Sequence, residues 1–194
     1  MEHSKRPSNP VVSIIVPVLN EEESVDLFVQ TVRRELEKAV LDFEILFIND
    51  GSFDKTLDRL IGLIEQDRRI RVINFSRNFG KEVALTAGID HAAGDVLIPM
   101  DVDLQDPPDL IPVFLEKGRE GYDVVYGVRS TRRHDNVVKR TTAALFYSIF
   151  NSLSHLHVPE NAGEYRMIDR RVAETIRQMP ERYRFMKGLF AWVG

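Results

Sequence analysis

Residues 96–108 read Val-Leu-Ile-Pro-Met-Asp-Val-Asp-Leu-Gln-Asp-Pro-Pro, a short apolar stretch followed at once by acidic residues and prolines. The apolar part predicts a buried strand, and the two consecutive prolines prevent that strand from continuing. Side chains two residues apart in an extended segment point the same way, so Asp101 and Asp103 converge. Two carboxylates at a strand end suit Mg²⁺ or Mn²⁺ carrying a diphosphate, but an acidic surface turn has the same composition. The stretch therefore predicts either a metal site or an ordinary turn.

Apolar runs of this kind alternate with amphipathic segments along much of the chain. Strands are predicted at residues 11–18, 43–48, 71–75, 96–99 and 124–127. Helices are predicted after residues 21–23, over about 55–67, over 80–91 and over 110–119. The inward faces of the first two helices are Val25, Phe28, Val29, Val32, Leu36 and Val40, and then Leu57, Leu60, Ile61 and Ile64. Because strands and helices alternate, we expect an α/β fold with a mostly parallel sheet covered by helices on both faces.

Polar residues follow four of the predicted strands. They are Asn20-Glu21, Asn49 to Ser52, Ser76 to Asn78, and Asp101 to Asp106. Ligands of parallel α/β sheets bind at the carboxyl ends of the strands, so we expect these groups to share one crevice. Neither a Gly-x-Gly-x-x-Gly turn nor a P-loop motif occurs, which disfavours dinucleotide binding and P-loop nucleotide binding. A nucleotide bound here would need a metal where those proteins use a glycine-rich loop.

Length and composition are those of one globular domain. The chain has 194 residues and a net charge of -4, and that charge argues against a dedicated nucleic-acid-binding protein. There is no cysteine, which excludes disulfides and thiolate metal sites. Residues 1–10 are polar and lack the apolar core of a signal peptide, and no run approaches the roughly 20 apolar residues of a membrane-spanning helix. We therefore expect a single soluble domain over residues 1–194.

The last third of the chain has a different character. Residues 129–140 are rich in Arg and Lys and predict either a solvated loop or a site for lipid phosphate and anionic headgroups. A strongly apolar helix is predicted around residues 143–153, and another helix over about 170–179. The aromatic segment 185–194 fits either the core or a membrane interface.

Five segments, at residues 13–22, 47–52, 76–82, 101–107 and 179–188, carry a family resemblance. Together they resemble the family 2 glycosyltransferases of the glycosyltransferase-A (Rossmann-like) fold. More narrowly, they are similar to the bacterial polyprenyl-phosphate (bactoprenol) glycosyltransferases and the dolichol-phosphate mannose synthase group. The resemblance implies a single catalytic domain that transfers a hexose with inversion. The donor would be a nucleotide sugar, with UDP-glucose as the first candidate, the acceptor a polyprenyl (undecaprenyl) phosphate, and the cofactor Mg²⁺ or Mn²⁺.

The same resemblance implies roles for individual residues. Nucleotide-sugar binding falls to Pro17, Leu19, Glu21, Asp50, Lys81, Asp101, Val102 and Gln105. The metal and diphosphate positions are Asp101, Asp103 and Gln105. Phosphate of the acceptor would meet Arg129, Arg132, Lys139 and Arg140. The catalytic positions are Asp103, Glu164 and Arg166.

Two departures from the family pattern affect these expectations. Glu164 and Tyr165 stand where the family usually has Asp and Phe, and the extra methylene of Glu164 shifts its carboxylate. A phosphate acceptor is already anionic and needs little help from a base, so an orienting role for Glu164 beside Arg166 fits. The family also continues into membrane helices after the segment matched by Trp192-Val193-Gly194. We therefore expect a soluble fragment of a protein that works at the cytoplasmic face of the bacterial inner membrane; a homo-oligomer stays open.

Three other functions share parts of this sequence pattern. A nucleotide-sugar-binding module without turnover would keep the donor site and transfer nothing. A family 2 transferase acting on a sugar hydroxyl would need a strong base, which the Glu164 departure slightly disfavours. A nucleotidyltransferase normally has a glycine-rich loop after its first strand, and residues 17–21 offer none.

Overall fold

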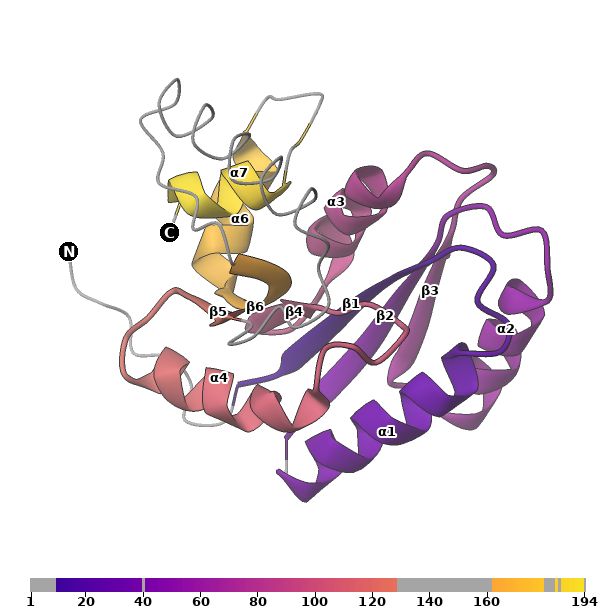
Figure 1. Ribbon diagram of the computed structural model, residues 1–194, viewed down its shortest axis with the longest axis horizontal. Coiled ribbons are helices and arrows are strands. Elements are labelled where there is room, and N and C mark those ends of the chain that lie inside the picture. Colours follow the sequence, from indigo (N-terminus) through magenta and orange to yellow (C-terminus); the bar gives the residue numbers. More distant parts are fainter. Residues whose placement is uncertain (1–9, 40, 129–161, 180–183, 185, 194) are drawn as a thin grey trace, which may run out of the picture.

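The structure is a computed structural model that describes residues 10–39, 41–128, 162–179, 184 and 186–193 (Figure 1). The basic stretch at residues 129–140 and the apolar segment at 143–153 lie outside these residues. The side chains of residues 162–164, 187 and 191 lie outside them as well.

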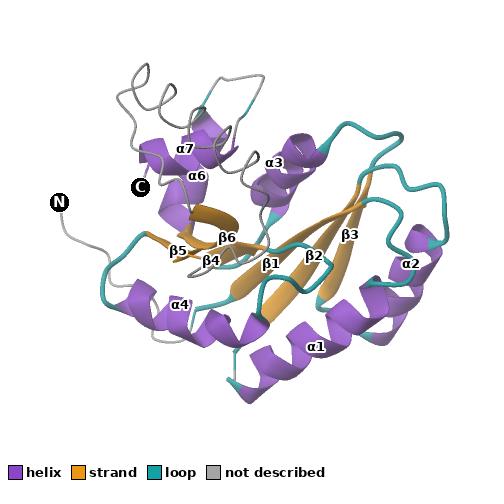
Figure 2. Ribbon diagram, in the orientation of Figure 1, coloured by secondary structure: helices purple, strands orange, loops and turns teal. Residues whose placement is uncertain are grey.

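A single six-stranded sheet organises the described residues, with the strand order β3-β2-β1-β4-β6-β5 (Figure 1, Figure 2). The four parallel strands are β1 (Val12–Val18), β2 (Phe43–Asn49), β3 (Ile70–Asn74) and β4 (Val96–Pro99). Strand β6 (Ala162–Asp169) runs antiparallel to β4, and β5 (Val124–Val128) runs antiparallel to β6. The predicted mostly parallel sheet is confirmed, with an antiparallel strand inserted next to β4.

Helices cover both faces of this sheet. On one face lie α1 (Val25–Lys38), α2 (Thr56–Gln66) and α4 (Ile111–Arg119), the last preceded by a 3-10 turn at Pro108–Leu110 (Figure 1, Figure 2). On the other lie α3 (Lys81–His91), α6 (Arg170–Gln178) and α7 (Met186–Val193) (Figure 1). Each face has its own buried apolar cluster, one packed under α1, α2 and α4 and the other under α3, α6 and α7. None of the helices in the described residues is both long and apolar enough to cross a bilayer.

Most predicted elements are confirmed, but one inward position is wrong, and neither β6 nor α7 was predicted. The inward face predicted for α1 is buried from Val25 to Leu36, while Val40 lies outside the described residues. In α2 the prediction for Ile61 is wrong, because its side chain is 47% exposed and Leu63 is buried in its place. Residues 161–168 were assigned no element, yet β6 covers Ala162–Asp169. Residues 164–167 do alternate polar and apolar side chains, so this short run was the signal available for a strand.

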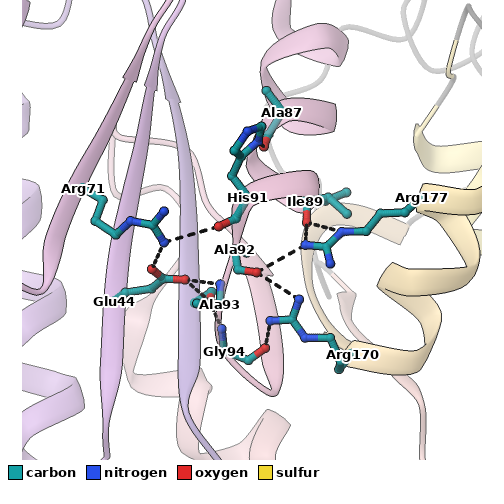
Figure 3. Close-up of polar contacts among 11 residues, drawn as sticks. Glu44, Arg71, Ala87, Ile89, His91, Ala92, Ala93, Gly94, Arg170 and Arg177 are labelled. Carbon is teal, nitrogen blue, oxygen red and sulfur yellow. Dashed lines mark hydrogen bonds and ion pairs between the residues drawn. The ribbon is translucent and has the colours of Figure 1, made fainter.

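A buried carboxylate anchors the loop between α3 and β4 (Figure 3). Glu44 on β2 accepts hydrogen bonds from the Ser13 hydroxyl at 2.6 Å, the Ala93 N–H at 2.5 Å and the Arg71 guanidinium at 2.6 Å. Burial alone would raise the pKa of Glu44, but these three donors outweigh it and hold that pKa below its usual range. The buried charge is therefore fully paired.

Two arginines of α6 hold the same loop from the other side (Figure 3). Arg170 donates to the carbonyls of Ala92 and Gly94, and Arg177 donates to those of Ile89 and Ala92. Cations at this end of α3 also suit the negative end of its helix dipole. Since one end of α3 is tied to the sheet and to α6, the other end is held at the carboxyl ends of the parallel strands.

Candidate active site

A pocket of about 220 Å³ opens at the carboxyl ends of β1 and β2, beside the start of α3. Its lining consists of Pro17, Val18, Leu19, Glu21, Asp50, Asn78, Gly80, Lys81 and Asp101. Polar residues from four separate strand ends thus share one crevice, as the alternation of strands and helices predicted. Six residues of the predicted nucleotide-sugar site are among them: Pro17, Leu19, Glu21, Asp50, Lys81 and Asp101.

Hydrogen bonds between two loops shape one wall of this pocket. The Asn20 N–H donates to the Ser52 hydroxyl at 2.9 Å, and the Asn20 side-chain oxygen accepts from the Phe53 N–H at 3.0 Å. The Glu21 N–H donates to the Thr56 hydroxyl at 2.7 Å. Asn20 has a positive φ of 57°, a conformation that asparagine tolerates better than most residues. The loop after β1 is thereby fixed against the loop after β2.

Asp50 fixes the start of α3. Its carboxylate is 4% exposed and accepts the backbone N–H groups of Phe79 at 2.7 Å and Gly80 at 2.9 Å. The next residue, Gly51, has a φ of +72°, and a Cβ there would collide with the backbone of Arg77 and Asn78. Only glycine lets these loops approach so closely. A contact between Asp50 and a nucleoside base, implied by the family resemblance, stays a prediction.

Lys81, the first residue of α3, reaches across the pocket to Asp101 at the end of β4. Its ammonium lies 2.7 Å from one oxygen of the Asp101 carboxylate and 3.0 Å from the other. The two side chains are 41% and 43% exposed, so water screens this ion pair only in part. A cation already sits on one of the two carboxylates predicted to hold a metal.

A second, smaller cavity of about 20 Å³ also borders this ion pair. Its lining is Lys81, Glu82, Leu85, Pro99, Met100, Asp101, Asp106, Arg166, Met186 and Phe190. Arg166 is 4% exposed, and its guanidinium lies 4.7 Å from the centre of the Phe190 ring. Lys81 and Asp101 line both cavities, so the second one adjoins the pocket at the strand ends.

The second cavity is also lined by Glu82, Asp106 and Phe190, none of which is among the predicted site residues. Glu82 accepts the N–H of Met186 at 3.0 Å, which joins the starts of α3 and α7. Asp106 is 8% exposed, and Phe190 covers Arg166. Glu82 and Asp106 both lie in segments that carry the family resemblance, so that match was the signal available. Nothing in the local sequence ties Phe190 to Arg166.

The turn after β4 presents the other metal-site candidates. Asp103 is exposed, and its carboxylate accepts the Gln105 N–H at 3.0 Å, which shapes the turn. Leu104 between them has a φ of +58°. Val102 is 5% exposed and packs in the core, so a contact from Val102 to a nucleotide sugar would come from its backbone. Within the part of the chain that the structure describes, Asp101 lines both cavities, whereas residues 102–105 line neither.

The donor atoms on this turn fit a hard divalent cation. Within the described residues no group of three or more His, Cys, Asp and Glu side chains could hold a metal. Asp101 and Asp103 nevertheless supply carboxylate oxygens, and Mg²⁺ is commonly held by one or two carboxylates with substrate phosphates and water completing its shell. The site therefore fits a metal that binds together with a diphosphate better than a metal held by protein alone.

The remaining predicted site residues are placed only in part. Arg166 lies on β6, two residues after Glu164, whose side chain is outside the described residues. Arg129, Arg132, Lys139 and Arg140 also lie outside the described residues. Between Glu164 and Arg166, Tyr165 is 4% exposed, and its ring centre lies 4.9 Å from that of Phe114.

A mostly parallel sheet with a pocket at its strand ends, beside an Asp-x-Asp turn, is the arrangement expected of the glycosyltransferase-A fold. The family model described as "Glycosyl transferase family 2" matches residues 13–177, and the chain belongs to this family. The chain is therefore a glycosyltransferase domain.

Two curated relatives match almost the whole chain. An uncharacterized glycosyltransferase of Synechocystis, sll0501, is 48% identical over 183 residues, covering 94% of this chain and 58% of the relative. The prophage bactoprenol glucosyl transferase homolog of Escherichia coli K12 is also 48% identical over 183 residues, covering 94% of this chain and 60% of the relative. The chain thus spans about 60% of the length of these relatives.

Solved structures support the fold. The glucosyl-3-phosphoglycerate synthase of Mycobacterium tuberculosis, in complex with Mn²⁺, UDP-glucose and phosphoglyceric acid, superposes with a TM-score of 0.60 at 22% identity. The match covers 84% of this chain and 57% of the synthase. At this level of identity the likeness establishes the shared fold.

Proposed function

We propose that this domain catalyses the inverting transfer of a hexose from a nucleotide sugar to a polyprenyl phosphate, with UDP-glucose as donor and undecaprenyl phosphate as acceptor. The observation that carries the proposal is the pair of adjoining cavities that share Lys81 and Asp101. The larger cavity lies at the carboxyl ends of the strands, where ligands of such sheets bind, and the smaller one is lined by the buried Arg166. The bactoprenol glucosyl transferase name of a 48% identical relative supports this class of acceptor.

The donor side of the site suits a nucleoside diphosphate. The pocket beside Pro17, Leu19 and Asp50 would receive the nucleoside, which places the diphosphate toward Lys81 and Asp101. Asp101, Asp103 and Gln105 would hold Mg²⁺ or Mn²⁺, and a bound cation supplies charge neutralisation for the departing diphosphate. The Lys81 ammonium would add a second positive charge at the same diphosphate.

The acceptor side suits an anion. Arg166 is held by β6 and by the Phe190 ring, and its guanidinium can donate two parallel hydrogen bonds to phosphate oxygens. We assign Glu164 to orienting this group, since a phosphate is already ionised at neutral pH. Arg129, Arg132, Lys139 and Arg140 would hold the phosphate or the surrounding membrane surface.

The reaction then follows as one displacement. An oxygen of the lipid phosphate attacks the anomeric carbon of the hexose from the face opposite the diphosphate. The new carbon–oxygen bond forms as the bond to the diphosphate breaks, and that electron pair leaves with UDP. A single displacement inverts the configuration at the anomeric carbon. Because the acceptor is a membrane lipid, the reaction would take place at a membrane surface, and we assign it to the cytoplasmic face of the bacterial inner membrane.

A panel of donors tests this function. UDP-glucose, UDP-galactose and UDP-N-acetylglucosamine are each incubated with Mg²⁺ or Mn²⁺ and a short-chain polyprenyl phosphate, and lipid-linked hexose is measured by mass spectrometry. The proposal predicts product from UDP-glucose. Donor binding without product would instead indicate a binding module, and transfer only to an added saccharide would overturn the lipid acceptor.

A further inference from the structure

Lys81 stands where a lysine is locally unfavourable. It is the first residue of α3, and the N-terminus of a helix carries a partial positive charge that repels cations. Glu82, the next residue, follows the usual preference for acidic side chains in the first turn. Departures from local preference are expected at functional or strained sites.

The position of Lys81 is nevertheless firmly determined. Asp50 holds the two preceding N–H groups, Phe79 and Gly80, and the far end of α3 is held by Arg170 and Arg177. The ammonium therefore projects from a fixed point, and it contacts both oxygens of Asp101 at 2.7 and 3.0 Å. A metal ion that coordinates Asp101 has to displace or share this contact.

We propose that Lys81 is a built-in counter-cation that occupies Asp101 until a nucleotide diphosphate draws its ammonium away, so that the divalent cation and the nucleotide bind cooperatively. The inference rests on the proposed function, since it takes Asp101 as a metal ligand and the adjoining pocket as the nucleotide site. Lys81 lines that pocket and would find a new anionic partner in the diphosphate. Asp101 is then released to the metal.

The charges explain why such an arrangement is useful. Without ligand, Lys81 balances Asp101, so the carboxylates attract a divalent cation only weakly. When the nucleotide is bound, its diphosphate adds negative charge and pairs with the Lys81 ammonium in place of Asp101. Binding of the metal then becomes favourable. By linkage, the metal must then strengthen nucleotide binding by the same factor that the nucleotide strengthens metal binding. Lys81 is a positioning residue in this account, because it acts through Asp101.

Binding of Mn²⁺, followed by the electron paramagnetic resonance signal of the free ion, tests the inference without any catalytic turnover. The titration is done with and without UDP on the wild type and on Lys81→Met. We expect Lys81→Met to bind Mn²⁺ alone about three- to tenfold more tightly, because a positive charge within contact distance of a ligand is removed. UDP should strengthen Mn²⁺ binding by a smaller factor in Lys81→Met than in the wild type. Direct coordination of the metal by UDP is common to both proteins, so the difference isolates the lysine.

Two further variants serve as controls. Lys81→Arg keeps the positive charge and should retain the weak Mn²⁺ affinity of the wild type. Lys117→Met removes the same charge from an ion pair of similar exposure, in which Lys117 of α4 lies 2.8 Å from Glu120, just after the helix. Lys117 lies in the last turn of α4, which precedes the edge strand β5, and it lines neither cavity. This variant should therefore bind Mn²⁺ as the wild type does.

The outcomes separate the inference from the proposed function. If Mn²⁺ binds in the presence of UDP but Lys81→Met has the wild-type affinity or a weaker one for Mn²⁺ alone, the inference is wrong and the proposed site stands. Equal Mn²⁺ affinity of the wild type with and without UDP would also overturn the inference. If neither protein binds Mn²⁺ even with UDP, the metal site itself is wrong and both proposals fall.

Discussion

The hydroxyl of Tyr165 donates a hydrogen bond to the backbone carbonyl of Pro107, with 2.9 Å between the two oxygens. This bond joins β6, which carries Arg166, to the turn that carries Asp101 and Asp103. Burial, with the nearby charges of Asp106 and Asp109, raises the pKa of Tyr165 well above its usual range, so the hydroxyl remains a donor. The tyrosine at a position where the resembling family usually has phenylalanine thus has a structural role in this chain.

Replacement of Tyr165 by phenylalanine should destabilise the protein by about 1 kcal/mol, because the Pro107 carbonyl loses its donor while the ring packing against Phe114 is kept. Urea unfolding measures this change. Tyr122→Phe is the matched control, since Tyr122 is 57% exposed, and its effect should stay within about 0.5 kcal/mol. Equal stability of both variants and the wild type would show that the bond contributes nothing.

Gly51→Ala should lower both stability and donor affinity. The Cβ would meet the backbone of Arg77 and Asn78 in a conformation with φ +72°, so we expect a loss of about 2 kcal/mol or more. Thermal unfolding and UDP titration report the two effects. Gly62→Ala is the control: nothing lies within 4 Å of its Cβ, and in the interior of α2 alanine should stabilise by up to about 1 kcal/mol. A harmless Gly51→Ala would mean that the two loops need not approach closely.

Glu44 should make stability depend on pH in the acid range. Its pKa in the folded protein lies below the usual value, so its contribution is complete above the unfolded pKa of about 4.5 and is lost as pH falls through the folded pKa. Glu44→Gln should cost about 1–3 kcal/mol near neutral pH, because Arg71 and the Ala93 N–H lose a charged acceptor. The difference in unfolding free energy between Glu44→Gln and the wild type should become smaller below about pH 4.5. Urea unfolding at several pH values measures it, and a constant difference would contradict this account.

Arg166→Lys should weaken the acceptor side of the site and spare the donor side. Lysine keeps the charge but loses the planar pair of donors, so we expect the KM for polyprenyl phosphate to rise about tenfold or more. Affinity for UDP should change by less than about twofold, because Arg166 lines the second cavity and not the larger pocket. A loss of UDP affinity as large as the change in KM would place Arg166 in the donor site instead.

Sequence patterns predicted the parts of the fold that rest on local preferences. The run at residues 43–49 is buried throughout, and its composition alone indicates a buried strand. The polar residues at the strand ends also predicted a shared crevice, because parallel strands bring their carboxyl ends to one edge of the sheet.

The parts that were missed depend on contacts between distant segments. Strand β6 carries Arg166, which is buried because Phe190 covers it from α7, and no local pattern signals this. The contact between Lys81 and Asp101 spans 20 residues and depends on how α3 packs against β4. Both residues were expected near the nucleotide, but their ion pair appears only in three dimensions.

The central claim is that the turn carrying Asp101 and Asp103 holds a divalent cation together with the diphosphate of a nucleotide sugar. Calorimetric titration of UDP-glucose into the wild type, with and without Mn²⁺, tests it most directly, alongside Asp103→Ala and, as a control, Asp109→Ala at a nearby exposed position. The account predicts that Mn²⁺ raises affinity about tenfold or more in the wild type and in Asp109→Ala, and that Asp103→Ala loses this gain. An affinity for UDP-glucose that is independent of Mn²⁺ and unchanged in Asp103→Ala would contradict it.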